Sequence, residues 1–143
     1  MSTYDLEVWT ITPDGEMIAS AGTGGRVTGI KKVAQRYMIA LLQDLNPAKP
    51  KLGRRQPYGS GFLHTMKSGE MRTEMDVMSA FSLAKVQARM AIQDEETDED
   101  PPEERFKASH LLKIEVTPGV MKLHIRIETR TDGIDVIYPI RTE

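Results

Sequence analysis

The stretch MKLHIRIET, residues 121–129, alternates apolar and polar side chains without a break. The odd-numbered positions hold apolar residues, namely Met121, Leu123, Ile125 and Ile127. The even-numbered positions hold polar residues, namely Lys122, His124, Arg126 and Glu128. A period of two is that of a β-strand whose side chains point to opposite faces of a sheet. One face buried and one face in water is typical of antiparallel sheets. The stretch therefore predicts a half-buried antiparallel strand.

Two more strands are predicted beside it, at residues 110–116 and 134–140. They are joined to it by Thr-Pro-Gly and by Thr131-Asp132-Gly133, which are turn-forming sequences. The C-terminal strands, residues 110–140, thus form a three-stranded antiparallel sheet. Because the third strand comes last, we expect it at the edge of the sheet, with backbone groups open to a partner strand.

The N-terminal part predicts a hairpin and a helix. Strand-forming residues 4–11 are followed by the turn Thr-Pro-Asp-Gly, residues 12–15, and by a second short apolar run, residues 17–19. Over residues 30–45, apolar side chains recur every three to four positions, as in an amphipathic helix. Its polar residues are expected on the exposed face: Lys31, Lys32, Gln35 and Arg36.

A second amphipathic helix is predicted for residues 70–93. Its buried stripe is Val77, Phe81, Ala84, Ala88 and Ile92. Met71, Met75 and Met78 widen this stripe. They offer apolar surface to another helix, or they pack in the protein's own core.

Residues 94–104, DEETDEDPPEE, carry eight acidic side chains among eleven positions and two prolines. Such a segment is expected to be a solvated connector. A calcium-binding EF-hand loop is not indicated, because its glycine and its ligand spacing are missing. With 143 residues, the chain predicts one α+β domain, residues 1–143.

Composition and motifs argue against several kinds of site. The chain has no cysteine, a net charge of -2 and no apolar run long enough to span a membrane. The glycine-rich run at residues 22–29 fails the spacing of a dinucleotide-binding loop. The histidines are scattered, Ser60 lacks a recognisable triad, and no pair of carboxylates is placed for glycoside hydrolysis. We expect no catalytic, cofactor or metal site, and no nucleic-acid or membrane binding.

The order of the segments resembles a known family. The chain contains, in this order, a hairpin, the segment RVTGIKKVAQRYMIALL, a proline-rich loop with PYGSGF, a long helix, the segment PPEERF and three final strands. This order is similar to the baseplate wedge proteins of contractile phage tails, a family described as lysozyme-like and shared with type VI secretion and tailocin baseplates. The resemblance covers about residues 4–141. Its most specific pieces are residues 27–42 and Tyr58-Gly59-Ser60.

The resemblance implies a structural, non-enzymatic role in the tail baseplate of a virion, assembled in the host cytoplasm. Six copies would pack with other wedge subunits in a helical bundle around the central hub or tail tube. The C-terminal strands would template the first ring of the tail sheath protein. The family's Glu-Pro-Arg motif corresponds to Glu103-Glu104-Arg105, in which Glu104 replaces the proline.

Several residues are expected at partner interfaces. In the loop at residues 53–62, Arg54 and Arg55 would reach an acidic neighbour, while the glycines shape the turn. The full predicted interface is Arg54, Arg55, Tyr58, Gly59, Ser60, Glu103, Arg105, Ile134, Val136, Tyr138 and Ile140. The alternative function is a peptidoglycan-degrading, lysozyme-like enzyme, as the family's description suggests. A small nucleic-acid-binding module ranks last because the charge balance does not favour it.

Overall fold

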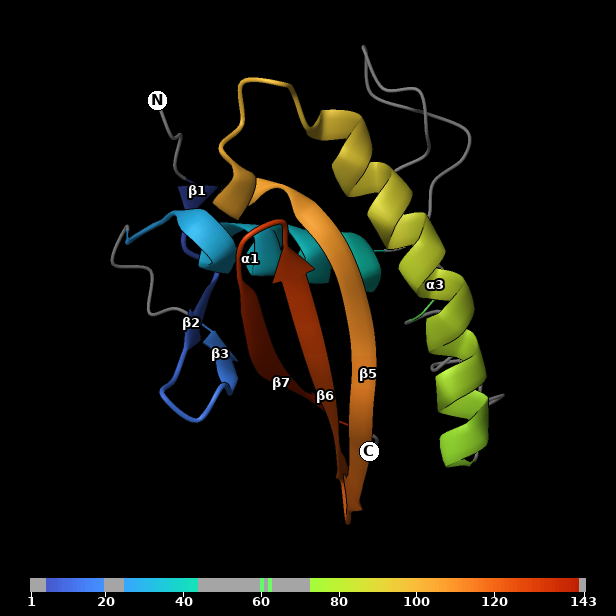
Figure 1. Cartoon of the computed structure of the whole chain (residues 1–143). Coiled ribbons are helices and arrows are strands. Elements are labelled where there is room, and N and C mark those ends of the chain that lie inside the picture. The colour runs from blue at the N-terminus through green and yellow to red at the C-terminus, as the bar shows by residue number, and fades with distance from the viewer. Residues whose placement is uncertain (1–4, 20–24, 44–59, 61, 63–72, 142–143) are drawn as a thin grey trace. The chain divides into compact units, whose positions relative to one another are not determined.

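A computed structural model of the chain describes residues 5–19, 25–43, 60, 62 and 73–141 (Figure 1). The predicted α+β class is confirmed: the described residues include an N-terminal hairpin, two α-helices and a C-terminal three-stranded antiparallel sheet. The chain divides into two compact units, Met1–Gln35 with Glu99–Glu143, and Arg36–Asp98. The division falls inside the first helix, α1 (Gly29–Leu42).

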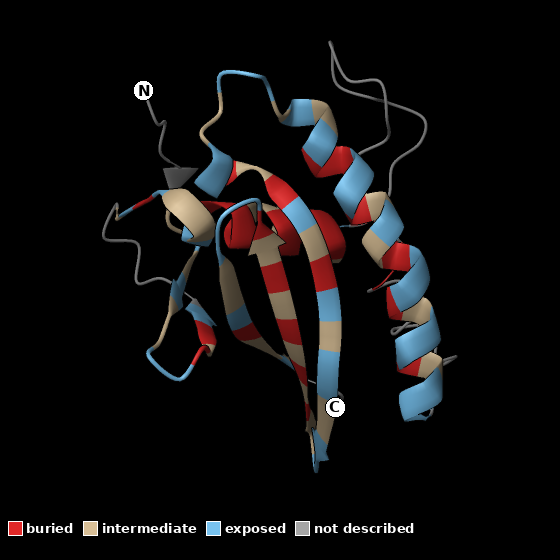
Figure 2. Cartoon of the chain, viewed as in Figure 1, coloured by how far each residue is buried: buried red, intermediate tan, exposed pale blue. Residues whose placement is uncertain are grey.

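The C-terminal sheet has the strand order β5 (Phe106–Thr117), β6 (Val120–Thr129), β7 (Gly133–Arg141), all antiparallel. β6 shows the predicted alternation, with buried and half-buried residues in strict succession (Figure 2). Ile125 lies opposite Leu111 on one side and Val136 on the other, so the apolar side chains share one face of the sheet. The sheet therefore forms as its middle strand predicts.

The N-terminal hairpin is confirmed as β2 (Trp9–Ile11) paired with β3 (Met17–Ala19). It packs against the last strand, because the rings of Trp9 and Tyr138 meet edge to face with their centroids 5.8 Å apart. In its turn, Gly15 has a positive φ of 93°, and its carbonyl oxygen accepts the N–H of Ile137 at 2.8 Å. A side chain at position 15 would lie 2.7 Å from the carbonyl oxygen of Asp135, so the close approach requires glycine.

A second short antiparallel pair was not predicted. β1 (Asp5–Leu6) pairs with β4 (Arg26–Val27). The glycine-rich run at residues 22–29 thus contains the short strand β4. Two-residue strands carry no periodicity of their own, which is why the pattern does not reveal them.

The polar face predicted for α1 is wrong at two positions. Lys32 is 2% exposed and Gln35 is 3% exposed, whereas Lys31 is exposed as predicted. Each buried side chain has a partner in its own unit: Gln35 Oε1 accepts the N–H of Val8 at 2.7 Å, and Lys32 pairs with Glu104. Buried polar groups of this kind need such partners, and a helical pattern alone cannot supply them.

The second predicted helix is α3 (Glu74–Glu95). It begins with a reciprocal capping box between Thr73 and Asp76. All five residues of the predicted stripe are buried, and the ring of Phe81 meets that of Phe62 at 6.2 Å. Met75 and Met78 are exposed, and Met71 lies outside the described residues.

The acidic connector departs from the prediction at both ends. Its first residues belong to α3, and residues Pro102–Glu104 form a 3-10 turn, η1. Glu104 is buried, so this end of the segment is not solvated. Glu104 is buried because it forms an ion pair with Lys32 of α1.

Candidate partner interface

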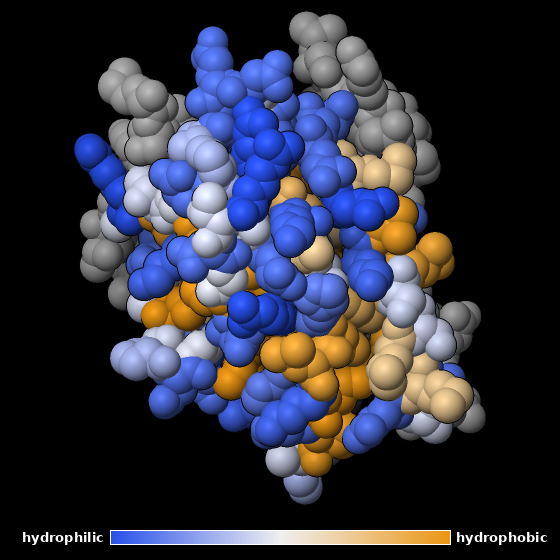
Figure 3. Space-filling model, in the orientation of Figure 1, coloured by the Kyte–Doolittle hydropathy of each residue, from blue (hydrophilic) through white to orange (hydrophobic). Residues whose placement is uncertain are grey.

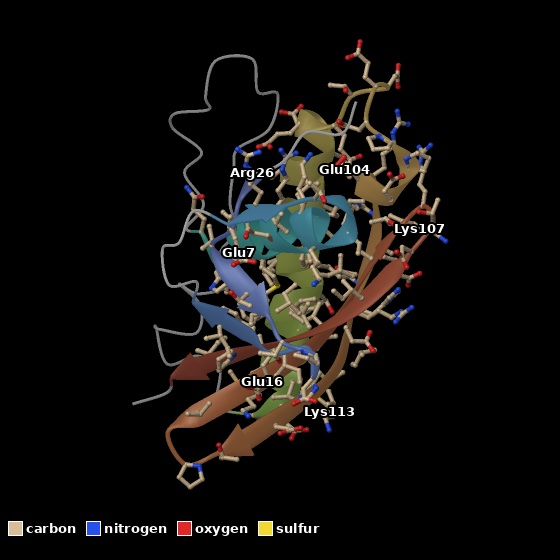
Figure 4. All side chains as sticks on the ribbon, turned by 90° about the vertical axis from the view of Figure 1, so that its left-hand side faces the viewer. Glu7, Glu16, Arg26, Glu104, Lys107 and Lys113 are labelled. Atoms are coloured by element: carbon tan, nitrogen blue, oxygen red, sulfur yellow. The ribbon has the colours of Figure 1, made fainter. Side chains whose placement is uncertain are left out.

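The PPEER segment joins the connector to α1 through Glu104. Lys32 Nζ donates to Glu104 Oε1 at 3.3 Å, and the N–H of Gly29 donates to the same oxygen at 3.3 Å. Both ionic side chains are 2% exposed. Figure 4 labels Glu104 beside α1. The carboxylate thus meets a backbone donor at the start of the helix, where such groups lack partners within the helix.

The resemblance assigns importance to Glu103 and Arg105, and the structure places them differently. Glu103 is exposed on η1. Arg105 is half-buried: its Nε donates to the carbonyl oxygen of Asp100 at 3.0 Å, and its own carbonyl oxygen accepts the N–H of Arg130 at 3.2 Å. These contacts fix the bend of the connector against the end of β6. The buried acid is Glu104, the residue between Glu103 and Arg105.

Of the predicted loop residues, only Ser60 is described; Arg54, Arg55, Tyr58 and Gly59 lie outside the described residues. Ser60 is buried. Its Oγ donates to the carbonyl oxygen of Leu41, and its N–H donates to that of Gln43 at 2.8 Å. Carbonyls at a helix end lack partners within the helix, and Ser60 satisfies the one in the last turn of α1. Its described contacts thus cap the C-terminal end of α1.

The predicted β7 residues direct their backbone groups towards β6. The N–H of Ile137 points away from β6 and donates to Gly15, so the even-numbered residues of β7 make the backbone hydrogen bonds to β6. These residues are Ile134, Val136, Tyr138 and Ile140. Val136 is fully buried, and desolvation by partial burial raises the pKa of Tyr138.

The outer edge of β7 has few donors to offer. β7 is an edge strand, as expected. Of the residues whose backbone faces outward, Ile137 gives its N–H to Gly15, and Pro139 has none. Proline on the open side of an edge strand is a known protection against strand pairing. A partner strand could therefore not continue a regular ladder along β7.

We call the opposite edge, β5, open because no strand of the described residues lies beyond it. Backbone groups alternate in direction along a strand, so Met121 and Leu123 of β6 bond to β7 and not to β5. Ile114 and Val116 lie opposite these two residues, and their backbone groups therefore point away from β6. Leu112, at a register irregularity, is 52% exposed, and Val116 is 65% exposed. Figure 3 shows hydrophobic residues at the surface over this half of β5.

Sequence reasoning missed β5 as the open edge, although a signal existed. The doubled leucine at positions 111 and 112 breaks the alternation, as an irregularity at an edge strand does. In the structure, Leu111 is half-buried whereas Leu112 is exposed, so the sheet buries only one of the two leucines.

Charged side chains cover the other face of the sheet. Lys122 pairs with Glu16 at 3.1 Å, and Arg126 pairs with Asp135 at 2.9 Å. On β5, Lys113 lies 3.0 Å from Glu115, and its hydrogen bond is the main cause that lowers the pKa of the Glu115 carboxyl. The Lys113 side chain remains 61% exposed, so its amine is accessible to reagents beside the open edge.

Sites for chemistry are sparse in the part of the chain that the structure describes. No group of three His, Asp or Glu side chains converges there as metal ligands. None of the described helices is long and apolar enough to cross a membrane. Comparison of the chain with protein-family models, curated proteins and solved structures found no match.

Proposed function

We propose that this chain is a structural, non-enzymatic subunit of a contractile-tail baseplate wedge. It joins other wedge subunits around the hub or tail tube, and its C-terminal sheet templates the first ring of the sheath. The order of sequence segments supports this proposal. The observation that carries it is the open edge of β5, where exposed Leu112 and Val116 lie beside backbone groups that no described strand pairs with.

The recognition chemistry is strand addition. An extended segment of the sheath protein takes its place beside β5 and bonds to the outward groups of Ile114 and Val116. Backbone hydrogen bonds supply affinity, while the exposed apolar side chains of Leu112 and Val116 set the register. The irregularity at Leu112 limits the regular ladder to the C-terminal part of β5, so a short segment suffices.

A peptidoglycan-degrading enzyme is the second candidate. Retaining and inverting glycosidases both need two carboxyl groups across the sugar, one of them in an apolar setting that keeps it protonated. Glu104 is a buried carboxylate, but its Oε1 is bound to Lys32 and to the N–H of Gly29. The side chain of Glu104 is also only 2% exposed, so a sugar could not reach it as the general-acid role requires. We therefore rank this function second.

The composition of purified particles tests the proposal. Contractile particles from producing cells are washed in high salt, and their proteins are quantified by mass spectrometry against labelled peptides. We expect this chain at the copy number of the sixfold wedge subunits. Absence from washed particles, together with a zone of clearing on peptidoglycan from the purified chain, would transfer the assignment to the enzyme.

A further inference from the structure

α3 carries a second apolar stripe, on the face opposite its buried residues. The stripe consists of Met75, Leu83, Val86 and Met90, all exposed. Met75 is 75% exposed and Leu83 is 70% exposed. Solitary exposed apolar residues are common, but a line of them along one helix marks an interaction surface. The buried and exposed faces give α3 apolar residues on two sides.

The spacing of the exposed residues is that of a short coiled-coil seam. Starting at Ser79, the intervals to Leu83, Val86 and Met90 are four, three and four residues. In a heptad, Leu83 and Met90 occupy a positions and Val86 the d position between them. The d positions on either side are polar, with Ser79 before this core and Gln93 after it. Three apolar layers thus lie between two polar ones on a single seam.

The charges beside the seam select the partner and its direction. Arg89 takes a g position and Asp94 the following e position. In a parallel pair of identical helices, each g residue faces the next e residue of the other chain, so each Arg89 meets Asp94 of the partner subunit. In an antiparallel pair, g faces g and e faces e, so Arg89 and Asp94 never meet. The remaining g and e residues carry no charge: Met75, Ala80, Ser82 and Gln87.

We propose that this face of α3 binds a second copy of this chain as a parallel, in-register pair of helices. The seam begins after Asp76, whose carboxylate accepts the N–H of Thr73 in the capping box. With only three apolar layers, the pairing is weak in dilute solution and is favoured when copies are held close together. The proposal does not depend on the baseplate assignment. It concerns the purified chain alone, and its test uses no particle.

Disulfide trapping tests the register and detects weak pairing. Because the chain has no cysteine, Ser79→Cys supplies one thiol per copy, at a d position where parallel helices bring both copies together. Ser82→Cys is the matched control, the same substitution at an exposed residue of the same helix, but at a g position beside the seam. Under mild oxidation, we expect disulfide dimers of Ser79→Cys to form at least about tenfold faster than those of Ser82→Cys.

A charge exchange in the Ser79→Cys chain tests the pairing itself. Arg89→Glu should slow trapping about five- to tenfold, because two attractive contacts become repulsive. Adding Asp94→Arg should restore the rate to within about twofold. Leu83→Glu should reduce trapping to the rate of the Ser82→Cys control. It should leave the helix content unchanged by circular dichroism, since Leu83 is exposed.

Three results would each reject the proposal. They are equal trapping of Ser79→Cys and Ser82→Cys, a trapping rate that Leu83→Glu does not change, and a charge exchange without rescue. The first would exclude the parallel register, and the second would exclude the apolar seam. A chain that does not pair with itself but binds a helix of another protein through Leu83 would also reject it, by assigning the stripe to a different partner.

Discussion

Replacement of Glu104 by alanine is expected to lower the free energy of unfolding by about 3–5 kcal/mol. The change removes the carboxylate that accepts hydrogen bonds from the buried Lys32 Nζ and from the Gly29 N–H. Truncation of one partner of a buried ion pair costs this much because the other charge stays desolvated. Urea unfolding followed by circular dichroism measures the effect, provided that the slope m is unchanged.

Two further variants separate the ion pair from general effects in this segment. Glu103→Ala removes an adjacent but exposed carboxylate and should change stability by no more than about 0.5 kcal/mol. The double variant Lys32→Met, Glu104→Leu removes both charges and should recover most of the loss. If Glu104→Ala costs no more than Glu103→Ala, the ion pair does not join η1 to α1.

Replacement of Val116 by proline is expected to reduce the fraction of sheathed tails by at least about tenfold. Proline lacks the N–H that Val116 directs to the outer edge of β5, so an added strand loses a hydrogen bond and meets the proline ring instead. The fold should survive, because this N–H makes no bond to β6. Electron microscopy of particles from complemented cells counts sheathed and bare tails.

Val116→Thr is the matched control for the edge variant. It keeps the backbone N–H and strand propensity while removing the apolar character of an exposed side chain. Near-normal sheathing with threonine and loss with proline would locate the recognition in the backbone. Normal sheathing with both variants would mean that β5 is not the template.

Removal of residues from 134 onward is a poorer experiment than these substitutions. It would delete Val136, which is fully buried, and would leave β6 with only one of its two neighbouring strands. Any failure to recruit sheath would then follow from unfolding of the sheet. The edge substitution avoids this problem because it alters a position that the protein's own ladder does not use.

Local patterns predicted much of the fold. The alternation of residues 121–129 and the helical stripe of α3 are properties of neighbouring residues, and both elements form as predicted. The pairing of Lys32 with Glu104 joins residues 72 positions apart, and no local pattern distinguishes these charges from exposed ones. The same applies to Gln35, whose partner is a backbone group of Val8.

The open edge shows a different limit of sequence reasoning. Sequence order places β7 last, and the structure confirms that it lies at an edge. Two features make the β7 edge unsuitable for a partner strand. The carbonyl oxygen of Gly15, in the distant hairpin, takes the N–H of Ile137, and Pro139 points its backbone outward. Which backbone groups point outward becomes known only when the register with the neighbouring strand is known. The candidate interface therefore moves from β7 to β5.

Cross-linking of intact particles with an amine-specific reagent, followed by mass spectrometry, identifies the protein that lies beside the β5 edge. Lys113 is exposed on β5, whereas Lys122 lies on the middle strand and pairs with Glu16. We predict links from Lys113 to the sheath protein, at higher yield than those from Lys122. Particles that contain this chain but join Lys113 only to proteins other than the sheath would contradict strand addition of the sheath protein at β5.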